Sequence, residues 1–262
     1  MAIINLTPDS FSGDGLAGKH PDEVLRRAET AVRDGAAILD IGGESTRPGA
    51  PSIGEAEELD RILPVLERLG PLGVPVSVDT NKPAVMRAAM AAGASLINDV
   101  NALRAEGALE AVASSAAAVC LMHMQGDPRT MQQAPAYDDV VAEVGAFLAH
   151  RVAVALSAGI ERQRIVVDPG FGFGKSVEHN WTLMRRLDFL GRNGLPVLVG
   201  ISRKSMLGAV TGRSVPDRMA ASLAAALMAV ERGARIVRVH DVAATRDVLR
   251  VWEAMQEVPP RS

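Results

Sequence analysis

Residues 165–175 read Ile-Val-Val-Asp-Pro-Gly-Phe-Gly-Phe-Gly-Lys, and their character changes at Asp168. The run up to this residue is apolar and β-branched, with no alternation of polar and apolar positions, which is typical of a strand buried on both faces. The residues after it are rich in glycine and end in a lysine. A helical pattern follows at His179–Leu190. The segment therefore predicts a strand, Ile165–Asp168, then a polar loop and a crossover helix.

The same order of strand, loop and helix occurs eight times along the chain. The expected strands are short apolar runs: Ala2–Asn5, Ile38–Ile41, Pro75–Val78, Ser95–Asn98, Val119–Met122, Ile165–Asp168, Val197–Gly200 and Ile236–Val239. The expected helices lie between them: Pro21–Asp34, Glu55–Leu69, Lys82–Ala92, Gly107–Ser115, Tyr137–Ser157, His179–Leu190, Pro216–Glu231 and Val242–Met255. Four glycines stand where such helices end, and glycine readily adopts the left-handed conformation that closes a last turn: Gly35, Gly93, Gly159 and Gly233.

Eight uninterrupted units predict an α/β fold, a closed (β/α)8 barrel of the TIM type. The chain has 262 residues, and such a barrel needs about 250. No linker, low-complexity segment or shift in composition divides the sequence, so we expect one domain over residues 1–262. Periodicity alone leaves an open, doubly wound sheet as the alternative.

Composition limits the kinds of partner and compartment. The formal net charge is -3, which disfavours nucleic-acid binding because that needs a basic surface. Cys120 is the single cysteine and cannot form an intramolecular disulfide. The N-terminal residues lack the order of a secretion signal, and no uninterrupted apolar run reaches the roughly 18 residues that span a bilayer. We therefore expect a cytoplasmic protein that binds small molecules and neither nucleic acid nor membrane.

Polar and glycine-rich clusters begin where the expected strands end. They are Asn5–Ser12, Gly42–Gly49, Asp79–Thr80, Asn98–Asp99, Met122–Gly126, Asp168–Lys175, Gly200–Lys204 and Arg238–Asp241. In a barrel all eight strand ends face the same way, so these clusters converge on the carboxyl-terminal mouth, where barrel enzymes keep their active sites. The opposite loops, such as Gly70–Gly73 and Arg192–Leu195, carry no such clusters.

Taken singly, these residues also have simpler interpretations. Three of them could be only helix caps or turn residues: Thr80, Asp99 and Asp241. The glycines of Gly170–Gly174 could serve only a turn, and Arg203 and Lys204 could be solvated charges. His123 is better interpreted as a buried, hydrogen-bonded histidine than as a metal ligand, because no second His or Cys lies at ligand spacing.

The residue types divide the expected mouth into two regions. Asp79, Asn98 and Asp168, the acceptor floor, point inward from three strands and offer mainly acceptors. They match a flat heterocycle with adjacent N–H and NH2 donors and a ring carbonyl. The cationic rim supplies donors and positive charge, which suit a phosphate or pyrophosphate leaving group and an anionic second substrate: Thr46, Arg47, Ser202, Arg203, Lys204, Arg238 and His240. Neither a Walker-type phosphate loop nor the dinucleotide glycine pattern is present.

Eight ordered motifs together resemble the dihydropteroate synthase family, pterin-binding folate-pathway enzymes that are the target of sulfonamides. They are Asn5–Ser12, Gly42–Gly49, Ser77–Thr80, Asn98–Asp99, Leu121–Gly126, Asp168–Lys175, Ser202–Lys204 and Arg238–Asp241. The resemblance implies condensation of 6-hydroxymethyl-7,8-dihydropterin pyrophosphate with p-aminobenzoate, giving 7,8-dihydropteroate and pyrophosphate. It also implies a dissociative substitution, in which pyrophosphate leaves before the amine attacks, and a homodimer.

The resemblance carries roles to matching positions. It makes Asp79, Asn98 and Asp168 ligands of the pterin ring, with Lys204 reaching the ring carbonyl and Arg238 stacking over the ring. The phosphate contacts carried over are Thr46, Arg47, Arg238 and His240. The benzoate contacts carried over are Pro48, Phe173, Ser202 and Lys204. Met122 completes the substrate-binding set, and Asn5 helps to hold Mg2+ with the pyrophosphate. Asp79, Lys204 and Arg238 are the expected catalytic residues.

Two loops, Thr7–His20 and Glu44–Gly54, resemble family loops that order when substrate binds. The first departs from the family pattern, because Ser12–Gly15 reads Ser-Gly-Asp-Gly where Ser-Asp-Gly-Gly is common. The role of Asp14 therefore stays open. Family members usually also carry a further stretch before the first strand.

Three other functions remain as alternatives. A pterin-binding methyltransferase that acts on methyltetrahydrofolate and a corrinoid protein shares the barrel and the acidic floor, but it does not need the contacts at Ser202–Lys204 and Arg238–His240. A non-catalytic pterin-binding protein is the second alternative. A Schiff-base aldolase that uses Lys204 is the third, although this lysine follows Arg203 in a polar loop.

Overall fold

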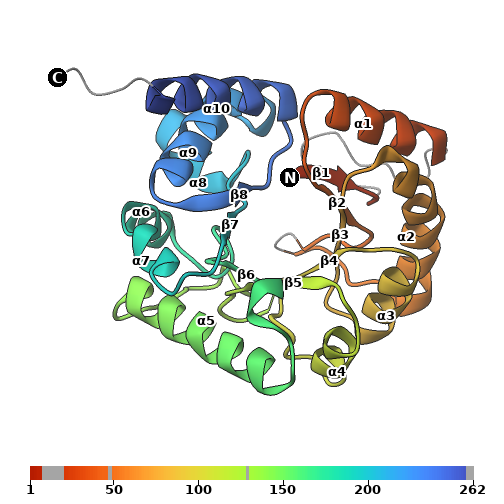
Figure 1. Ribbon diagram of the computed structural model, residues 1–262. Helices are drawn as coiled ribbons and strands as arrows, with labels where there is room; N and C mark the ends of the chain where they lie inside the picture. Colours follow the sequence, from red (N-terminus) through yellow and green to blue (C-terminus); the bar gives the residue numbers. More distant parts are fainter. Residues whose placement is uncertain (8–20, 47–48, 128–129, 258–262) are drawn as a thin grey trace.

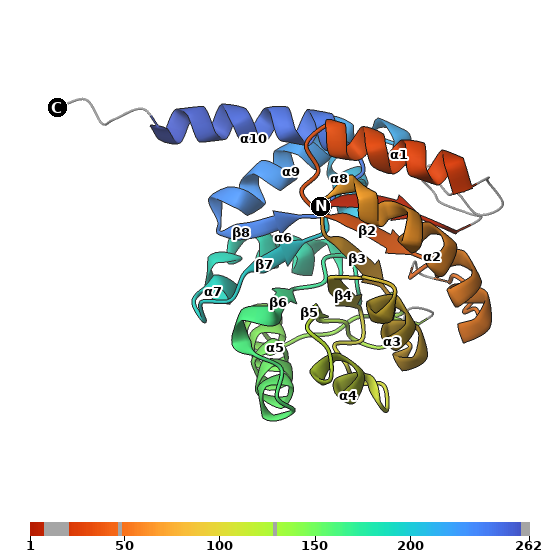
Figure 2. The ribbon, with the colours of Figure 1, turned by 45° about the vertical axis from the view of Figure 1, so that its right-hand side comes forward.

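The computed structural model describes residues 1–7, 21–46, 49–127 and 130–257. Figure 1 looks into a ring of strands surrounded by helices, and Figure 2 shows the same layers obliquely, turned by 45°. The strands are β1 (Ala2–Asn5), β2 (Leu39–Gly42), β3 (Val76–Asp79), β4 (Leu96–Asp99), β5 (Ala118–Met122), β6 (Ile165–Asp168), β7 (Val197–Val199) and β8 (Ala234–Val237).

The eight strands are parallel and follow one another in chain order around the sheet. The sheet closes on itself through a parallel bridge between Ala2 and Val239. At this seam the Ile3 N–H donates to Val239 O at 3.0 Å, and the Val239 N–H donates to Met1 O at 3.0 Å. The predicted closed barrel is therefore confirmed, and the open doubly wound sheet is excluded.

The outer layer consists of helices that follow the strands along the chain. They are α1 (Pro21–Arg33), α2 (Glu55–Leu69), α3 (Pro83–Ala91), α4 (Ala108–Ala113), α5 (Val140–Ser157), α6 (Val177–Arg185), α7 (Asp188–Gly191), α8 (Ser205–Thr211), α9 (Met219–Glu231) and α10 (Val242–Glu257). In both ribbon views α10 lies beside α1, so the last helix meets the first and completes the outer ring.

Local chemistry sets where these helices begin and end. The Asp139 carboxylate accepts hydrogen bonds from the backbone N–H groups of Val141 and Ala142 and so begins α5. The Ser176 hydroxyl accepts from the His179 N–H at the start of α6, and the His179 side chain accepts from the Ser176 N–H. All four predicted glycine stops adopt positive φ, between 91° and 101°.

Several boundaries differ from the sequence prediction. The helix predicted at His179–Leu190 is two helices, α6 and α7, and α8 was not predicted at all. Helix α8 has only seven residues, ending at Gly212 with φ of 67°, and so short a segment gives little helical periodicity. Strands β2, β3 and β4 each end one residue later than predicted, and this brings Gly42, Asp79 and Asp99 into the sheet.

Two apolar layers stabilise the barrel. The larger lies between strands and helices and includes fully buried Leu39, Val78 and Val119. Burying a side chain of this size contributes about 1.5 to 3 kcal/mol. A second, smaller cluster joins Cys120 and Leu198 with neighbours on other strands. The strands are therefore covered by apolar packing on both faces, as their unalternating sequences predict.

Among the described helices, α5 alone is long and apolar enough to cross a membrane by length and composition. The sequence count of uninterrupted apolar runs missed it, because polar residues such as Glu143 and Arg151 interrupt the apolar positions. In the structure its buried face includes Val144, Leu148 and Val152, and it packs beside β5. An amphipathic helix of a barrel's outer layer, buried on one face, can meet the same criterion, so the fold accounts for this long apolar helix.

Candidate active site

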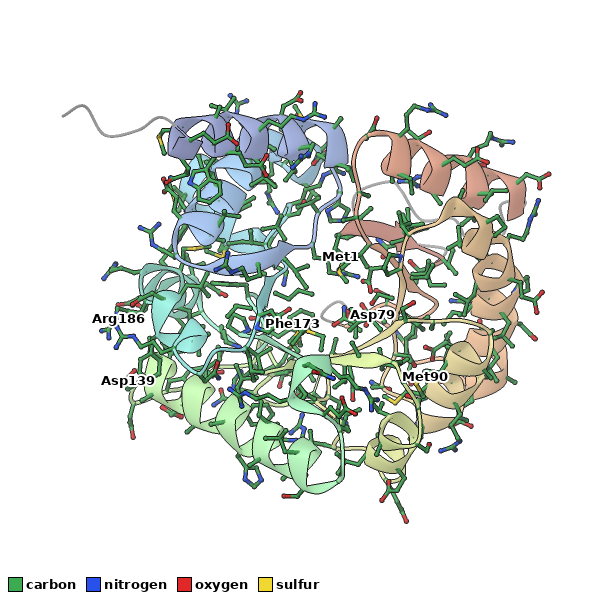
Figure 3. The ribbon with its side chains drawn as sticks, viewed as in Figure 1. Met1, Asp79, Met90, Asp139, Phe173 and Arg186 are labelled. Carbon is green, nitrogen blue, oxygen red and sulfur yellow. The ribbon has the colours of Figure 1, made fainter. Side chains whose placement is uncertain are left out.

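The carboxyl ends of the strands surround a cavity of about 500 Å³, a volume within the range of small-molecule sites. The predicted site residues that the structure describes all line it: Asn5, Thr46, Asp79, Asn98, Met122, Asp168, Phe173, Ser202, Lys204, Arg238 and His240. In Figure 3 the labelled Asp79 and Phe173 lie toward the middle of the ring, whereas Asp139 and Arg186 lie at its outer edge. One cavity thus contains the acceptor floor and the described part of the cationic rim.

Some sequence expectations lie outside the described residues. These are Arg47 at the phosphates, Pro48 at the benzoate, and Asp14. Of the first expected loop, Thr7–His20, the structure describes only Thr7, which is buried and lines the cavity.

The loop after β2 is held at Glu44, two residues before Thr46. Glu44 Oε2 lies 2.6 Å from Lys82 Nζ, and its Oε1 accepts a hydrogen bond from the Ile53 N–H at 2.9 Å. Lys82 Nζ also donates to the carboxylate of Glu58, which is fully buried on α2. A buried carboxylate such as that of Glu58 needs a partner, and Lys82 supplies it. The contacts of Lys82 and Ile53 with Glu44 therefore attach the loop after β2 to α2 and α3.

Arg238 connects two carboxylates on the inside of the barrel. Its Nε donates to Asp40 Oδ2 at 2.6 Å, and its Nη2 donates to Asp79 Oδ2 at 3.1 Å. Asn98 Nδ2 also reaches Asp40 Oδ2, at 3.4 Å. Asp40 therefore holds one residue of the acceptor floor and one of the cationic rim.

Sequence reasoning missed Asp40. It lies on β2 with no exposed surface, so it acts on a ligand only through the side chains that it holds. A signal was present, because Asp40 is an acid inside an otherwise apolar predicted strand, and a buried acid requires a partner. What the sequence did not supply is the partner, since Arg238 is 198 residues away along the chain.

The acceptor floor has unused acceptors. Among the described residues, Oδ1 of Asp79, which lines the cavity, has no hydrogen-bond partner. Burial raises the pKa of Asp79 to about 7, although the charge of Arg238 opposes this shift. Burial likewise raises the pKa of Asp168, against the nearby charge of Lys204. Buried acceptors without donors are costly, so the acceptor floor favours a ligand that brings N–H groups.

Lys204 lies between the acceptor floor and the glycine loop. Its Nζ donates to Phe171 O and lies 4.6 Å from the centre of the Phe173 ring. Burial lowers the pKa of Lys204 to about 8, while Asp168 favours its charged form. Asp168 Oδ1 in turn accepts from the Gly170 N–H at 2.7 Å. The interpretation of Lys204 as a solvated charge is therefore wrong, and it is more desolvated than its polar loop indicated.

Other residues of the cationic rim are also paired with neighbouring side chains. Ser202 Oγ lies 2.9 Å from His240 Nδ1. Arg203 makes a two-point contact with Asp241, at 2.6 and 3.2 Å, so Arg203 and Asp241 are neither a free charge nor a simple cap. Arg218 also lines the cavity and donates to Arg203 O at 3.0 Å. Sequence reasoning placed Arg218 inside a helix and gave no signal that it reaches the site.

Three of the simpler interpretations hold. Asp99 accepts the N–H groups of Asn101 and Leu103, at 2.7 and 2.6 Å, and so shapes a turn. Thr80 Oγ1 accepts from the Lys82 N–H at 3.3 Å. His123 is buried, and its Nδ1 is hydrogen-bonded to Lys175 Nζ at 2.8 Å.

Asn5 ends β1 and lines the cavity with a polar side chain. Within the described ranges, no group of three or more His, Cys, Asp or Glu is arranged to hold a metal ion. Mg2+ prefers oxygen ligands, keeps several waters, and often takes one or two protein oxygens together with substrate phosphates. A single amide oxygen at the rim fits an ion that arrives with a phosphorylated ligand, and it does not fit a resident ion held by protein alone.

Comparison with known proteins then defines the family. A family model described as "Pterin binding enzyme" matches residues 1–240. The dihydropteroate synthase of Neisseria meningitidis serogroup C is 51% identical over 259 residues, covering 97% of this chain and 92% of that protein. This chain belongs to the dihydropteroate synthase family. The Escherichia coli K12 dihydropteroate synthase is 48% identical and is covered to 90%, so the resemblance stated from eight motifs is confirmed.

Solved dihydropteroate synthases share the fold over nearly the whole chain. That of Yersinia pestis, in complex with a sulfonamide drug, has a TM-score of 0.94 at 46% identity, covering 98% of this chain and 93% of that one. That of Burkholderia cenocepacia, complexed with 7,8-dihydropteroate, has a TM-score of 0.89 at 53% identity, covering 98% and 90%. That of Xanthomonas albilineans with 4-aminobenzoic acid has a TM-score of 0.92 at 53% identity, covering 99% and 93%.

Proposed function

We propose that the protein is a dihydropteroate synthase, which joins 6-hydroxymethyl-7,8-dihydropterin pyrophosphate to p-aminobenzoate and releases pyrophosphate. The observation that carries this proposal is the pairing, within one cavity, of an acceptor floor with a cationic rim. A methyltransferase reaction uses the floor and leaves the rim without a partner. The names of the relatives support the same choice.

The pterin ring binds at the acceptor floor. Its N–H and NH2 edge donates to the carboxylate of Asp168, and Asp79 and Asn98 take the remaining ring groups. Each of these side chains is nearly buried, so its hydrogen bonds form away from competing water and discriminate strongly against rings that lack the donors. The unused Oδ1 of Asp79 is then satisfied by the ligand.

Arg238 has two tasks in this scheme. Without ligand its guanidinium binds Asp40 and Asp79. When the pterin takes over Asp79, the bond to Asp40 remains and holds the planar group where it stacks on the ring. The remaining N–H groups and charge are then available to the pyrophosphate.

The departure of pyrophosphate is favoured by positive charge at the rim. The C–O bond at the pterin methylene breaks, and its electron pair leaves with the pyrophosphate. Thr46, Arg47, Arg238 and His240 stabilise the charge that develops on the leaving oxygens. Asn5 would hold Mg2+ together with the pyrophosphate, and the ion would neutralise phosphate charge.

The amine of p-aminobenzoate then forms the new C–N bond at the methylene carbon and loses one proton to solvent. Phe173 and Pro48 contact its ring, and Ser202 and Lys204 bind its carboxylate. The carboxylate gives Lys204 an anionic partner in place of Phe171 O, which favours the ammonium form at neutral pH.

The protein works as a homodimer in the cytoplasm. Helices α8, α9 and α10 carry large exposed apolar side chains, which are Val210, Met219, Met228, Val251 and Met255. A second copy of the chain would cover such a surface. Sedimentation equilibrium tests this assignment, and a monomer at micromolar concentration contradicts it.

The activity is tested by incubating the protein with the pterin pyrophosphate, p-aminobenzoate and Mg2+, and separating the products by liquid chromatography. Formation of 7,8-dihydropteroate supports the proposal. Absence of product with folded protein, or methyl transfer from methyltetrahydrofolate to a corrinoid protein, contradicts it.

A further inference from the structure

Lys175, the last residue of the glycine loop after β6, has a nearly buried side chain and lies outside the cavity lining. Its Nζ lies 2.8 Å from His123 Nδ1, and it donates to Gly170 O at 3.0 Å and to Phe173 O at 2.9 Å. A lysine side chain is rarely buried, and when it is, its N–H groups need hydrogen-bond partners. None of the roles assigned above to the acceptor floor or the cationic rim uses this group.

The loop that Lys175 contacts, residues 169–174, lies outside the strands and lacks the backbone hydrogen bonds of the sheet. Gly170 has φ of 67° and lies so close to the residue after β5 that a Cβ there would overlap His123 O. Side chains bind its carbonyl groups instead. Lys204 binds Phe171 O, Gln132 Nε2 donates to Gly172 O at 2.5 Å, and Tyr137 Oη donates to Gly174 O at 2.7 Å. Side-chain donors, together with the backbone bond from the Phe173 N–H to Gly170 O at 3.0 Å, therefore set the conformation of this loop.

Lys175 binds the loop at both ends of its tightest part. Gly170 O and Phe173 O are three residues apart, and one Nζ reaches both. This contact fixes the peptide that carries the Phe173 ring, which faces the cavity and lies over Lys204 Nζ. We propose that Lys175 is a positioning residue that holds Phe173 for the benzoate ring. The inference rests on the proposed function, because that function places p-aminobenzoate against Phe173.

The hydrogen bonds of Lys175 do not depend on one protonation state. Burial lowers the pKa of Lys175 to about 7, and an amine that loses its proton keeps two N–H donors for the two carbonyl groups. Burial and the lysine charge lower the pKa of His123 to about 3. A neutral imidazole can accept from the ammonium, or donate from Nδ1 to the amine, so it matches either form.

The test is steady-state kinetics of Lys175→Met, which keeps an unbranched apolar stem and removes the donors. We expect the KM for p-aminobenzoate to rise at least about tenfold, because small displacements of a positioning group have effects of this size. The KM for the pterin pyrophosphate should change far less. If Lys175→Met folds poorly, His123→Leu takes its place, since it removes one anchor of Nζ and should shift the same KM in the same direction.

Arg164→Met is the matched control. Arg164 also binds two backbone carbonyls, those of Ala117 and Val112, both at 2.8 Å, but it lies outside the cavity lining. The Arg164→Met variant should have a lower melting temperature, but it should not show the selective rise in the KM for p-aminobenzoate. An unchanged KM for p-aminobenzoate in the Lys175 variant, or equal changes for both substrates as in a general loss of stability, overturns the inference. If the unmodified protein itself shows no turnover, the proposed function is overturned instead.

Discussion

Asp168→Asn separates ligand recognition from folding at the acceptor floor. Asp168 is 6% exposed, and its Oδ1 accepts the Gly170 N–H at 2.7 Å. Asparagine has nearly the same shape and keeps one oxygen for that bond. Its NH2 group then replaces the oxygen offered to the pterin, so donors of the ring face a donor of the protein.

The expected loss in affinity follows from this burial. Removing a charged partner from a buried hydrogen-bonded pair costs about 2 to 5 kcal/mol, which is about 30-fold to 5000-fold in Kd. The stability of the folded protein should not fall with the affinity. Burial raises the pKa of Asp168 in the folded protein, and a carboxyl with a raised folded pKa destabilises the fold once the pH exceeds its unfolded value. At pH 8 the neutral amide introduced by Asp168→Asn should therefore leave the melting temperature equal or higher.

Calorimetric titration with 6-hydroxymethyl-7,8-dihydropterin measures this loss. The ligand lacks the pyrophosphate, so the titration reports on the acceptor floor without the cationic rim. Asp99→Asn is the control, because Asp99 is also a buried carboxylate but lies outside the cavity lining, and its variant should retain the parent's affinity. Near-parental affinity in a folded Asp168→Asn protein would refute the reasoning.

Three further predictions concern the same site. The value of kcat/KM for the pterin pyrophosphate should rise as the pH increases through about 7, where Asp79 ionises. It should fall above about pH 8, where Lys204 loses its charge. A flat profile from about pH 6 to 9 would remove both groups from the reaction. Calorimetry should find that p-aminobenzoate binds only when pyrophosphate or the pterin pyrophosphate is present, because Lys204 is otherwise bound to Phe171 O. Equally tight binding of p-aminobenzoate to the ligand-free protein counts against this order of binding. Asn5→Ala should raise the Mg2+ concentration that gives half-maximal turnover, whereas an identical Mg2+ titration leaves Asn5 as a turn residue.

The barrel was predictable because its signals are local. Each strand carries an apolar run, and each following loop a polar cluster, so Asp79, Asn98 and Asp168 could be assigned to one mouth from chain order alone. Helix α8 and the break between α6 and α7 were not predictable, because segments of seven or fewer residues give too little periodicity.

Sequence reasoning missed Asp40 and the contacts of Lys175, and both side chains depend on partners distant in the chain. Asp40 depends on Arg238, and Lys175 on His123, which is 52 residues away. Arg218 lies in a helical pattern and reaches the cavity only because α9 begins beside the cationic rim. The residue type gave a warning for Asp40 and Lys175, since a charge among apolar or glycine residues needs a partner, but only the folded chain supplies that partner.

The central claim, substitution at the pterin methylene with departure of pyrophosphate, is tested by the fate of one oxygen atom. Pterin pyrophosphate labelled with 18O at the oxygen between the methylene and the first phosphorus is converted with p-aminobenzoate, and mass spectrometry follows the label. We predict that all of it appears in the pyrophosphate, with one dihydropteroate formed for each pyrophosphate released. Label retained in a hydroxymethylpterin product, or pyrophosphate released without dihydropteroate, would contradict the account.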